Sequence, residues 1–250
     1  MKIKIRLFSF FATALFGVLF IKQVQAQISL DLETGIVFTG LNHARIPGND
    51  GTFISFSGEL DADPKPFARF KAGYRFGKRS EVLILLAPLK FTYEGSVNRD
   101  VVFQGENYLA NTALTANYKF NSYRATYRYY LTDRENLTIG LGLSLKIRDA
   151  LIGLEGGGLQ SEKTDFGFVP LINFIVHWQP TKRFGLLLDG DALAAPQGRA
   201  EDVLAAITYQ ATEKLYLKAG YRILEGGADN KTVYTFSLFH YGVVGAVLKF

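Results

Sequence analysis

The sequence predicts an all-β fold: an antiparallel up-and-down transmembrane β-barrel of about ten strands, with eight or twelve strands as the alternatives. Three observations predict this fold. Apolar and polar residues alternate in segment after segment, short and long connections alternate along the chain, and aromatic residues gather where segments meet the short connections. Because successive side chains of a strand point to opposite faces, each alternating segment is a two-faced strand.

The composition agrees with this fold class. The 250 residues include 21 Phe, 13 Tyr and 25 Gly but only 7 Pro, and 48% of all residues are hydrophobic. Aromatic residues favour strands, and glycine favours turns. Such a high apolar content excludes a disordered chain.

Residues 1–26 predict a cleaved signal peptide. A basic start (Lys2, Lys4, Arg6) precedes the apolar run 7–20, and Ala26 supplies the small residue of a cleavage site. The alternative, an anchor helix, needs about 20 apolar residues. Residues 27–250 would then form one exported barrel domain.

Charge and cysteine content narrow the function classes. The formal net charge is +5, and the leader carries four basic residues and no acid, which leaves +1 for residues 27–250. This small charge gives no support for a nucleic-acid partner. The chain has no cysteine, which excludes disulfides, thiolate metal sites and a lipid anchor on cysteine.

Ten segments follow the two-residue alternation. The segment 137–148 is an example, with Leu137, Ile139 and Leu141 on one face and Thr138 and Gly140 on the other. In the fourth segment the alternation slips between Asn121 and Ser122, which predicts a β-bulge there. The predicted strands are 28–40, 66–77, 81–95, 112–131, 137–150, 166–179, 184–195, 203–211, 215–225 and 233–250.

The connections alternate between four short turns and five longer loops. The short turns are GKRS, TDREN, QPTKR and TEK, and the loops are 41–65, 96–111, 151–165, 196–202 and 226–232. Four turns on one side and five loops on the other are what a ten-stranded barrel with both ends on one side requires. Residues 51–60 either extend the second strand or belong to a folded loop.

Alternation also fits a soluble barrel with apolar residues inside, so the lipid-facing side needs separate evidence. The apolar faces carry almost no charge over the roughly 9–11 residues that span a membrane. Aromatic residues near the short turns resemble an interfacial girdle. They are Tyr74, Phe76, Tyr127, Tyr129, Trp178 and Phe184. The apolar faces are therefore expected to contact lipid.

The final VVGAVLKF, with Leu248 and Phe250 at alternate positions, resembles the C-terminal assembly signal of bacterial outer-membrane β-barrel proteins. GYRILEGGAD and VYTFSLFHYG are loosely similar to small, uncharacterised proteobacterial members of that superfamily. The resemblance implies a location in the bacterial outer membrane and recognition by the barrel-insertion machinery. It also implies that the last strand closes on the first. Outer-membrane lipid and lipopolysaccharide are then the expected partners.

If the apolar faces meet lipid, the charged faces line the lumen. Eleven basic and five acidic residues are predicted there: Arg69, Lys71, Arg75, Lys90, Lys119, Arg124, Arg128, Lys146, Arg148, Lys218 and Arg222, with Asp31, Glu33, Glu94, Asp189 and Asp191. Paired charges that fill a narrow barrel are one interpretation. The basic surplus supports another, a small anion-leaning channel.

The sequence offers little sign of catalysis. The three histidines lie on distant elements, so no metal site and no cofactor are predicted. Ser237, His240 and Glu225 are weak candidates for a lipid A-modifying hydrolase, but residues 237 and 240 fall on opposite faces of a regular strand. The leading prediction is a non-enzymatic envelope protein with a charged, largely filled lumen.

Overall fold

The computed structural model describes residues 27–195 and 198–250. The signal peptide predicted over residues 1–26 lies outside the described residues. Within the described part of the chain, no helix is long and apolar enough to cross a membrane.

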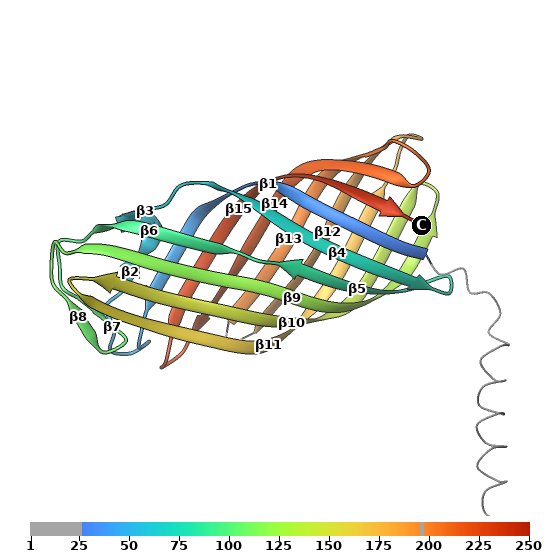
Figure 1. The fold of residues 1–250 in the computed structure, drawn as a ribbon. Helices are drawn as coiled ribbons and strands as arrows, with labels where there is room; N and C mark the ends of the chain where they lie inside the picture. The colour runs from blue at the N-terminus through green and yellow to red at the C-terminus, as the bar shows by residue number, and fades with distance from the viewer. Residues whose placement is uncertain (1–26, 196–197) are drawn as a thin grey trace, which may run out of the picture.

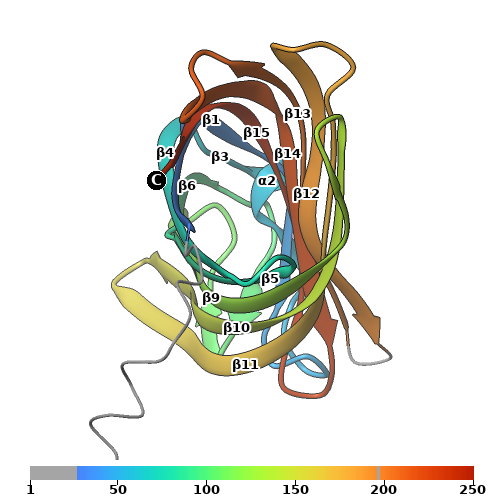
Figure 2. The same cartoon turned by 90° about the vertical axis from the view of Figure 1, so that its right-hand side faces the viewer.

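Ten long strands form a closed antiparallel ring (Figures 1 and 2). Each strand pairs with the next, β9 pairs with β10, and β15 pairs with β1, which closes the ring. This confirms the predicted up-and-down barrel of ten strands. The wall strands are β1 (Gln27–Arg45), β4 (Lys65–Phe76), β5 (Ser80–Ala87), β9 (Ala113–Arg134), β10 (Leu137–Gly156), β11 (Leu159–Trp178), β12 (Phe184–Ala195), β13 (Gly198–Gln210), β14 (Leu215–Asp229) and β15 (Tyr234–Lys249).

The predicted strand 81–95 is interrupted in the structure. After β5 ends, Pro88 separates it from β6 (Lys90–Ser96), and both pieces pair with the same neighbour, β9. Proline has no backbone N–H and cannot donate to a strand ladder. The two pieces therefore form one position in the wall with a break at the proline.

Two loops fold over the end of the barrel opposite the short turns. The first contains β2 (Ile54–Ser55), the short helix α2 (Phe56–Glu59) and β3 (Leu60–Asp61), and the second contains the hairpin β7 (Val101–Phe103) and β8 (Glu106–Tyr108). β2 pairs with β1, and β3 pairs with β6. Residues 51–60 thus belong to a folded loop and add no strand to the ring.

Apolar side chains hold these loops together, and they define what we call the cap. Ile46, Ile54 and Phe56 from the first loop and Val101 and Phe103 from the second are fully buried. They form one cluster with inward side chains of the wall, including Phe91, Tyr93 and Phe239. The barrel interior beneath the cap is therefore apolar.

This apolar interior explains why the predicted bulge in β9 is wrong. Leu114, Ala116 and Tyr118 point inward beneath the cap, and Ser122 and Arg124 point inward further along, without a break in the alternation. The side chains that face inward change from apolar to polar between residues 121 and 122, but the alternation of the strand continues without an extra residue. The irregular register lies elsewhere, at Ile139/Gly140.

Two predicted loops are largely strand. β10 and β11 continue through residues 151–165 to a tight turn at Gly157 and Gly158, which both have positive φ (59° and 82°). Such backbone angles suit two-residue hairpin turns, and glycine adopts them without steric cost. β13 already begins at Gly198, within the predicted loop 196–202.

An ion pair between the two cap loops should make the cap sensitive to acid. Arg99 Nη2 lies 3.0 Å from Glu59 Oε2, and this hydrogen bond holds the pKa of the Glu59 carboxyl below its usual value. A lowered carboxyl pKa gives stability above the usual pKa that is lost as pH falls through the lowered one. We therefore expect wild type to resist proteolysis of residues 46–64 better than Glu59→Gln at about pH 7, and this advantage should shrink as the pH falls below the usual glutamate pKa of about 4.3.

Comparing the two proteins at each pH cancels the pH dependence of the protease itself. A difference between them that stays constant over the whole range would contradict the role given to the Glu59 charge.

Candidate functional site in the barrel lumen

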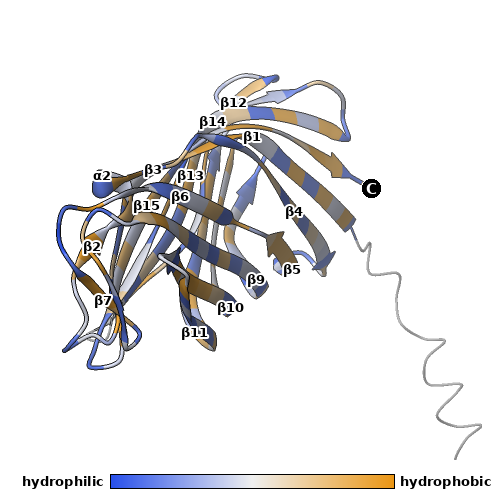
Figure 3. Cartoon of the chain, turned by 60° about the vertical axis from the view of Figure 1, so that its left-hand side comes forward, coloured by the Kyte–Doolittle hydropathy of each residue, from blue (hydrophilic) through white to orange (hydrophobic). Residues whose placement is uncertain are grey.

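The two faces of the wall differ sharply in polarity. On β10, Leu141, Leu143 and Leu145 are exposed on the outside, whereas Ser144 and Lys146 are buried inside. Figure 3 shows this alternation of hydrophobic and hydrophilic residues along the wall strands. An apolar exterior around a polar interior is the arrangement of a barrel surrounded by lipid.

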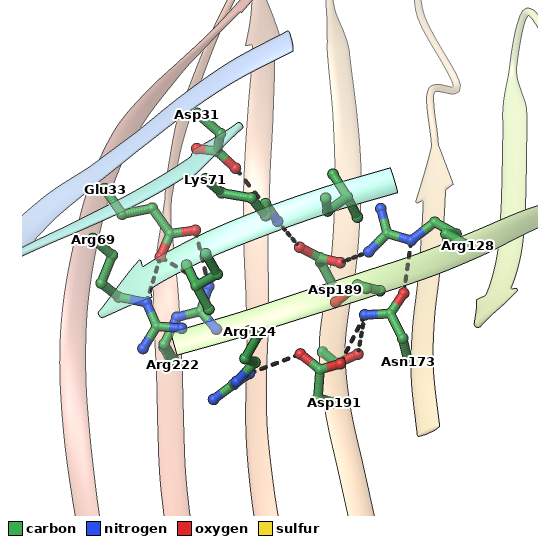
Figure 4. Close-up of a pocket in the computed structure, with 14 residues that line it drawn as sticks. Asp31, Glu33, Arg69, Lys71, Arg124, Arg128, Asn173, Asp189, Asp191 and Arg222 are labelled. Carbon is green, nitrogen blue, oxygen red and sulfur yellow. Dashed lines mark hydrogen bonds and ion pairs between the residues drawn. The ribbon is translucent and has the colours of Figure 1, made fainter. Parts of the chain in front are cut away.

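Charged side chains from seven wall strands meet near the middle of the barrel, and Figure 4 shows those of β1, β4, β9, β12 and β14. We call these twelve residues the central charge network. It contains equal numbers of bases and acids: Arg69, Lys71, Arg124, Arg128, Lys218 and Arg222, with Asp31, Glu33, Glu81, Asp189, Asp191 and Asp202.

Asp202 lies at the centre of one half of this network. Its carboxylate accepts hydrogen bonds from Arg69 Nη2 at 2.8 Å, Arg124 Nη2 at 2.5 Å and Arg222 Nη1 at 2.5 Å. Only 1% of the Asp202 side chain is exposed. A buried carboxylate needs such charged donors, because without them its desolvation would be unfavourable by several kcal/mol.

The acids of β1 connect this cluster to β14. Lys218 Nζ lies 2.7 Å from both Asp31 Oδ1 and Glu33 Oε1, and Arg222 Nη2 lies 2.8 Å from Glu33 Oε2. Arg69 Nε lies 3.5 Å from the same Glu33 carboxylate. β1 and β14 are therefore connected in two ways. Ion pairs connect them inside the lumen, and both strands also pair with β15 in the wall.

The other half of the network is built on β12. Arg128 Nη2 donates to Asp189 Oδ1 at 2.6 Å, and Arg124 Nη1 donates to Asp191 Oδ2 at 2.7 Å. Asn173 joins the two pairs: it accepts from Arg128 Nε at 2.8 Å and donates to Asp191 Oδ1 at 3.0 Å. These contacts neutralise the charges of the two arginines and also fix the orientation of their guanidinium groups.

Little space remains between these side chains. The cavity within the central charge network has a volume of about 30 Å³, which is about the share of one water molecule in the liquid. The side chains of the network therefore leave little internal space at this level.

Several predicted lumen residues lie elsewhere. Lys90 and Glu94 on β6 and Lys119 on β9 point away from the lumen, and Lys119 forms an ion pair with Asp149 on the outer face. Their placement inside was wrong because the apolar face of these segments turns inward beneath the cap. Arg75 pairs with Asp133 at the short-turn end, and Arg148 pairs with Asp165 towards the long-loop end.

Two residues of the network were not among the predicted ones. Asp202 was assigned to a loop, although Asp202, Leu204 and Ala206 already alternate in the sequence and all point inward. Glu81 precedes the continuous apolar run VLILLA, and such a run does not show which face of the strand points inward. In the structure Glu81 Oε2 lies 3.6 Å from Arg128 Nη1. The two acids remove much of the predicted basic surplus.

The three hydrolase candidates do not come together. Ser237 Oγ points inward and lies 2.9 Å from the Tyr118 hydroxyl. His240 lies against Phe38 on the outer face, with ring centroids 5.2 Å apart, and Glu225 pairs with Arg199. A serine and a histidine on opposite faces of one strand cannot exchange a proton directly.

The C-terminal strand forms the seam of the barrel. Leu248 lies opposite Leu30 of β1, and the Phe250 N–H donates to the Ile28 carbonyl oxygen at 2.9 Å. The last strand thus closes on the first, as the resemblance implied. Recognition of Leu248 and Phe250 by the insertion machinery stays a prediction.

No protein-family model and no curated protein matches the chain. Similar solved structures include the outer membrane protease OmpT from Escherichia coli (TM-score 0.48, 12% identity, 90% of this chain and 97% of that chain). Others are the translocator domain of the autotransporter NalP from Neisseria meningitidis (0.44, 13%, 95% and 93%) and the attachment invasion locus protein Ail of Yersinia pestis (0.41, 12%, 89% and 99%).

These values describe a likeness in overall architecture, and nothing about the activity of this chain follows from them. The closed ring, the apolar outer face and the polar lumen are properties of the chain itself. By its own structure, the chain has the fold of an outer-membrane β-barrel protein.

Proposed function

We propose that this protein is a non-enzymatic barrel of the bacterial outer membrane whose lumen is closed to ions by the central charge network. One observation carries the proposal: six bases and six acids pair across the barrel and leave a cavity of only about 30 Å³. Ions that crossed the barrel at this level would have to separate buried ion pairs, which is energetically costly.

The same network weakens the case for an anion-leaning channel. That interpretation depended on a surplus of basic residues in the lumen. With Glu81 and Asp202 inside and Lys90 and Lys119 outside, bases and acids of the central network balance. A neutral, filled cross-section offers an anion no favourable path.

The exterior supports a place in the outer membrane. All six aromatic residues predicted to form a girdle, among them Tyr74, Tyr127 and Trp178, are exposed on the wall near the short turns. Such residues lie at membrane interfaces, where one end of the ring is apolar and the other is hydrated. Lipid and lipopolysaccharide would surround the wall, and the insertion machinery would receive β15.

The proposal predicts an electrically silent protein. Refolded wild-type barrel in a planar bilayer, with a salt gradient across it, should give no discrete current steps. Its correct folding is shown by heat-modifiable gel mobility. Arg124→Ala combined with Arg128→Ala should mainly lower the stability, because Asp189, Asp191 and Glu81 lose partners.

Arg79→Ala combined with Arg134→Ala is the matched control, since these two arginines are exposed at the short turns. Steady current steps from the folded wild type, with an anion-selective reversal potential that the first pair of substitutions changes, would refute the proposal.

A further inference from the structure

The barrel wall has a gap beside β11, because β12 ends at Ala195, three residues past its last pair with β11, and β11 continues without it; we call this the β11–β12 gap. β11 pairs with β12 only from Ile172 to Trp178, whereas residues 159–171 pair only with β10. At about 3.3 Å per residue, this one-sided edge is roughly 40 Å long. Within residues 27–195 and 198–250, no other strand pairs with it.

The sequence gives a local reason for the gap. Pro170 lies two residues beyond the last pair, Ile172 with Ala192. Proline lacks the N–H that a ladder needs and occurs at sheet edges. On the opposite side of the barrel, β2 and β3 pair with β1 and β6, so the wall there is completed by the first cap loop.

A cavity of about 580 Å³ lies at this gap. Residues of β10 and β11 line one side, and small residues of β13 and β14 line the other, among them Gly198, Ala200, Gly226 and Ala228. The cavity is far larger than the space within the central charge network. Its size is that of a ligand pocket.

Lys146 points into this cavity from β10. It is 2% exposed, and within the described residues its ammonium group has no ion pair and no hydrogen bond. Its Nζ lies 4.2 Å from the centroid of the Phe120 ring. Buried charges are normally paired. The ammonium group of Lys146 is therefore available to an anion in the cavity.

Two more basic residues line the same cavity. Arg148 pairs with Asp165 through Nη2, but its buried Nε has no hydrogen-bond partner. Opposite it on β11 lies Gly167, where an added Cβ would lie 3.3 Å from Arg148 Nη2, so the missing side chain makes space for the guanidinium. Lys163 lies further along the inner face of β11.

The outer face of the same edge is strongly apolar. Phe166 and Phe168 are 68% and 63% exposed and lie edge to face with ring centroids 6.0 Å apart. One unpaired edge thus has aromatic rings on its lipid side and cations on its lumen side. A molecule that bridges the gap needs an anionic head and apolar chains.

We propose that the β11–β12 gap is a lateral binding site for a phosphate-bearing lipid of the surrounding membrane. Lys146 and Arg148 hold the phosphate inside the wall, and the acyl chains lie along Phe166 and Phe168 outside it. A lipid is favoured over a free anion because Phe168, which lines the cavity, also belongs to the exposed aromatic pair on the outer face. This inference is independent of whether the central charge network conducts.

The test uses a photoreactive residue in place of Phe168, in full-length barrel refolded into phosphatidylcholine vesicles that contain phosphatidylglycerol. The same residue in place of Leu143, which is 69% exposed on fully paired β10, is the matched control. We expect Lys146→Met combined with Arg148→Gln to lower crosslinking of phosphatidylglycerol from position 168 about tenfold, the effect of roughly 1.4 kcal/mol. Crosslinking from position 143 should not change.

Three outcomes would overturn the proposal. Equal losses at positions 168 and 143 would show general lipid contact, and no loss at 168 would show that the cations do not hold the headgroup. Inorganic phosphate that raises the unfolding temperature of wild type but not of Lys146→Met, without lipid specificity at 168, would assign the site to a free anion. If the double variant does not refold, Lys146→Met alone repeats the comparison.

Discussion

Asp202→Asn should lower the free energy of unfolding of the barrel by about 3–5 kcal/mol, the usual effect of removing one partner from a buried ion pair. The change keeps the shape of the side chain but removes the negative charge that Arg69, Arg124 and Arg222 share. The central charge network would then hold six bases and five acids, with one positive charge uncompensated in a nearly dry interior. Urea unfolding in phospholipid vesicles, followed by gel mobility without heating, measures the effect.

Glu201→Gln is the control, because it makes the same chemical change at the neighbouring residue, which points to the other face of β13. We expect its effect to be small, as for surface substitutions. Adding Arg124→Gln to Asp202→Asn restores neutrality and should recover part of the lost stability. An effect of Asp202→Asn no larger than that of Glu201→Gln would mean that water, and not the arginines, stabilises this carboxylate.

A central charge network with equal numbers of buried acids and bases suits a closed lumen better than an ion-selective pore. An ion-selective pore presents charges that a passing ion can contact, and binding must be weak enough for release. Here Arg128 is bound at once by Asp189 and Asn173, and Arg124 by Asp191 and Asp202. Their donors are already occupied, whereas Lys146 and the Nε of Arg148, which lie outside the network, are available to a ligand.

The wall could be predicted from the sequence because its physical cause is local. Lipid outside and polar side chains inside impose the two-residue alternation, as in the segment 137–148, and strands that cross the same membrane thickness need regular turns. Closure of β15 on β1 followed from a resemblance carried by Leu248 and Phe250. The number of strands followed from counting the alternating segments, and the four turns and five loops agreed with that count.

The interior beneath the cap could not be predicted in this way. Alternation shows that Tyr118 and Tyr123 lie on different faces, but not which face is inside when both are aromatic. That choice depends on the cap loops, whose residues Phe56 and Phe103 come from distant parts of the chain. The predicted bulge at Asn121/Ser122 was the result of assuming one kind of interior along the whole strand.

The gap between β11 and β12 was hidden for a related reason. Residues 159–171 look like a loop followed by a strand, and an unpaired edge leaves the same alternation in the sequence as a paired one. Pro170 was the available signal, since a proline inside an alternating segment indicates an edge. The sequence also could not show that Lys146 lacks an ion pair within the part of the chain that the structure describes. That becomes visible only when the strands around Lys146 are placed in three dimensions.

Gly35→Ala should prevent normal closure of the seam between β1 and β15. Gly35 has φ +140°, and a Cβ added there would lie 2.0 Å from the carbonyl oxygen of Gly242. The backbone strain alone should lower the stability by about 1–3 kcal/mol, and the contact with a backbone oxygen cannot be relieved by rotating a side chain. We expect most of the refolded protein to migrate as unfolded on an unheated gel.

Gly242→Ala tests whether the folding defect expected for Gly35→Ala comes from the blocked seam or merely from the loss of a glycine. Gly242 lies on β15 directly opposite Ile36, and a Cβ added to it meets no atom within 4 Å. The two substitutions add the same methyl group to the same seam, so Gly242→Ala should refold like wild type. If the two variants refolded equally well, β1 and β15 would have to lie further apart than their hydrogen-bonded register requires. The seam would then be a flexible contact, and the closed ring would depend on the charge bridge from Lys218 to Asp31 and Glu33 instead.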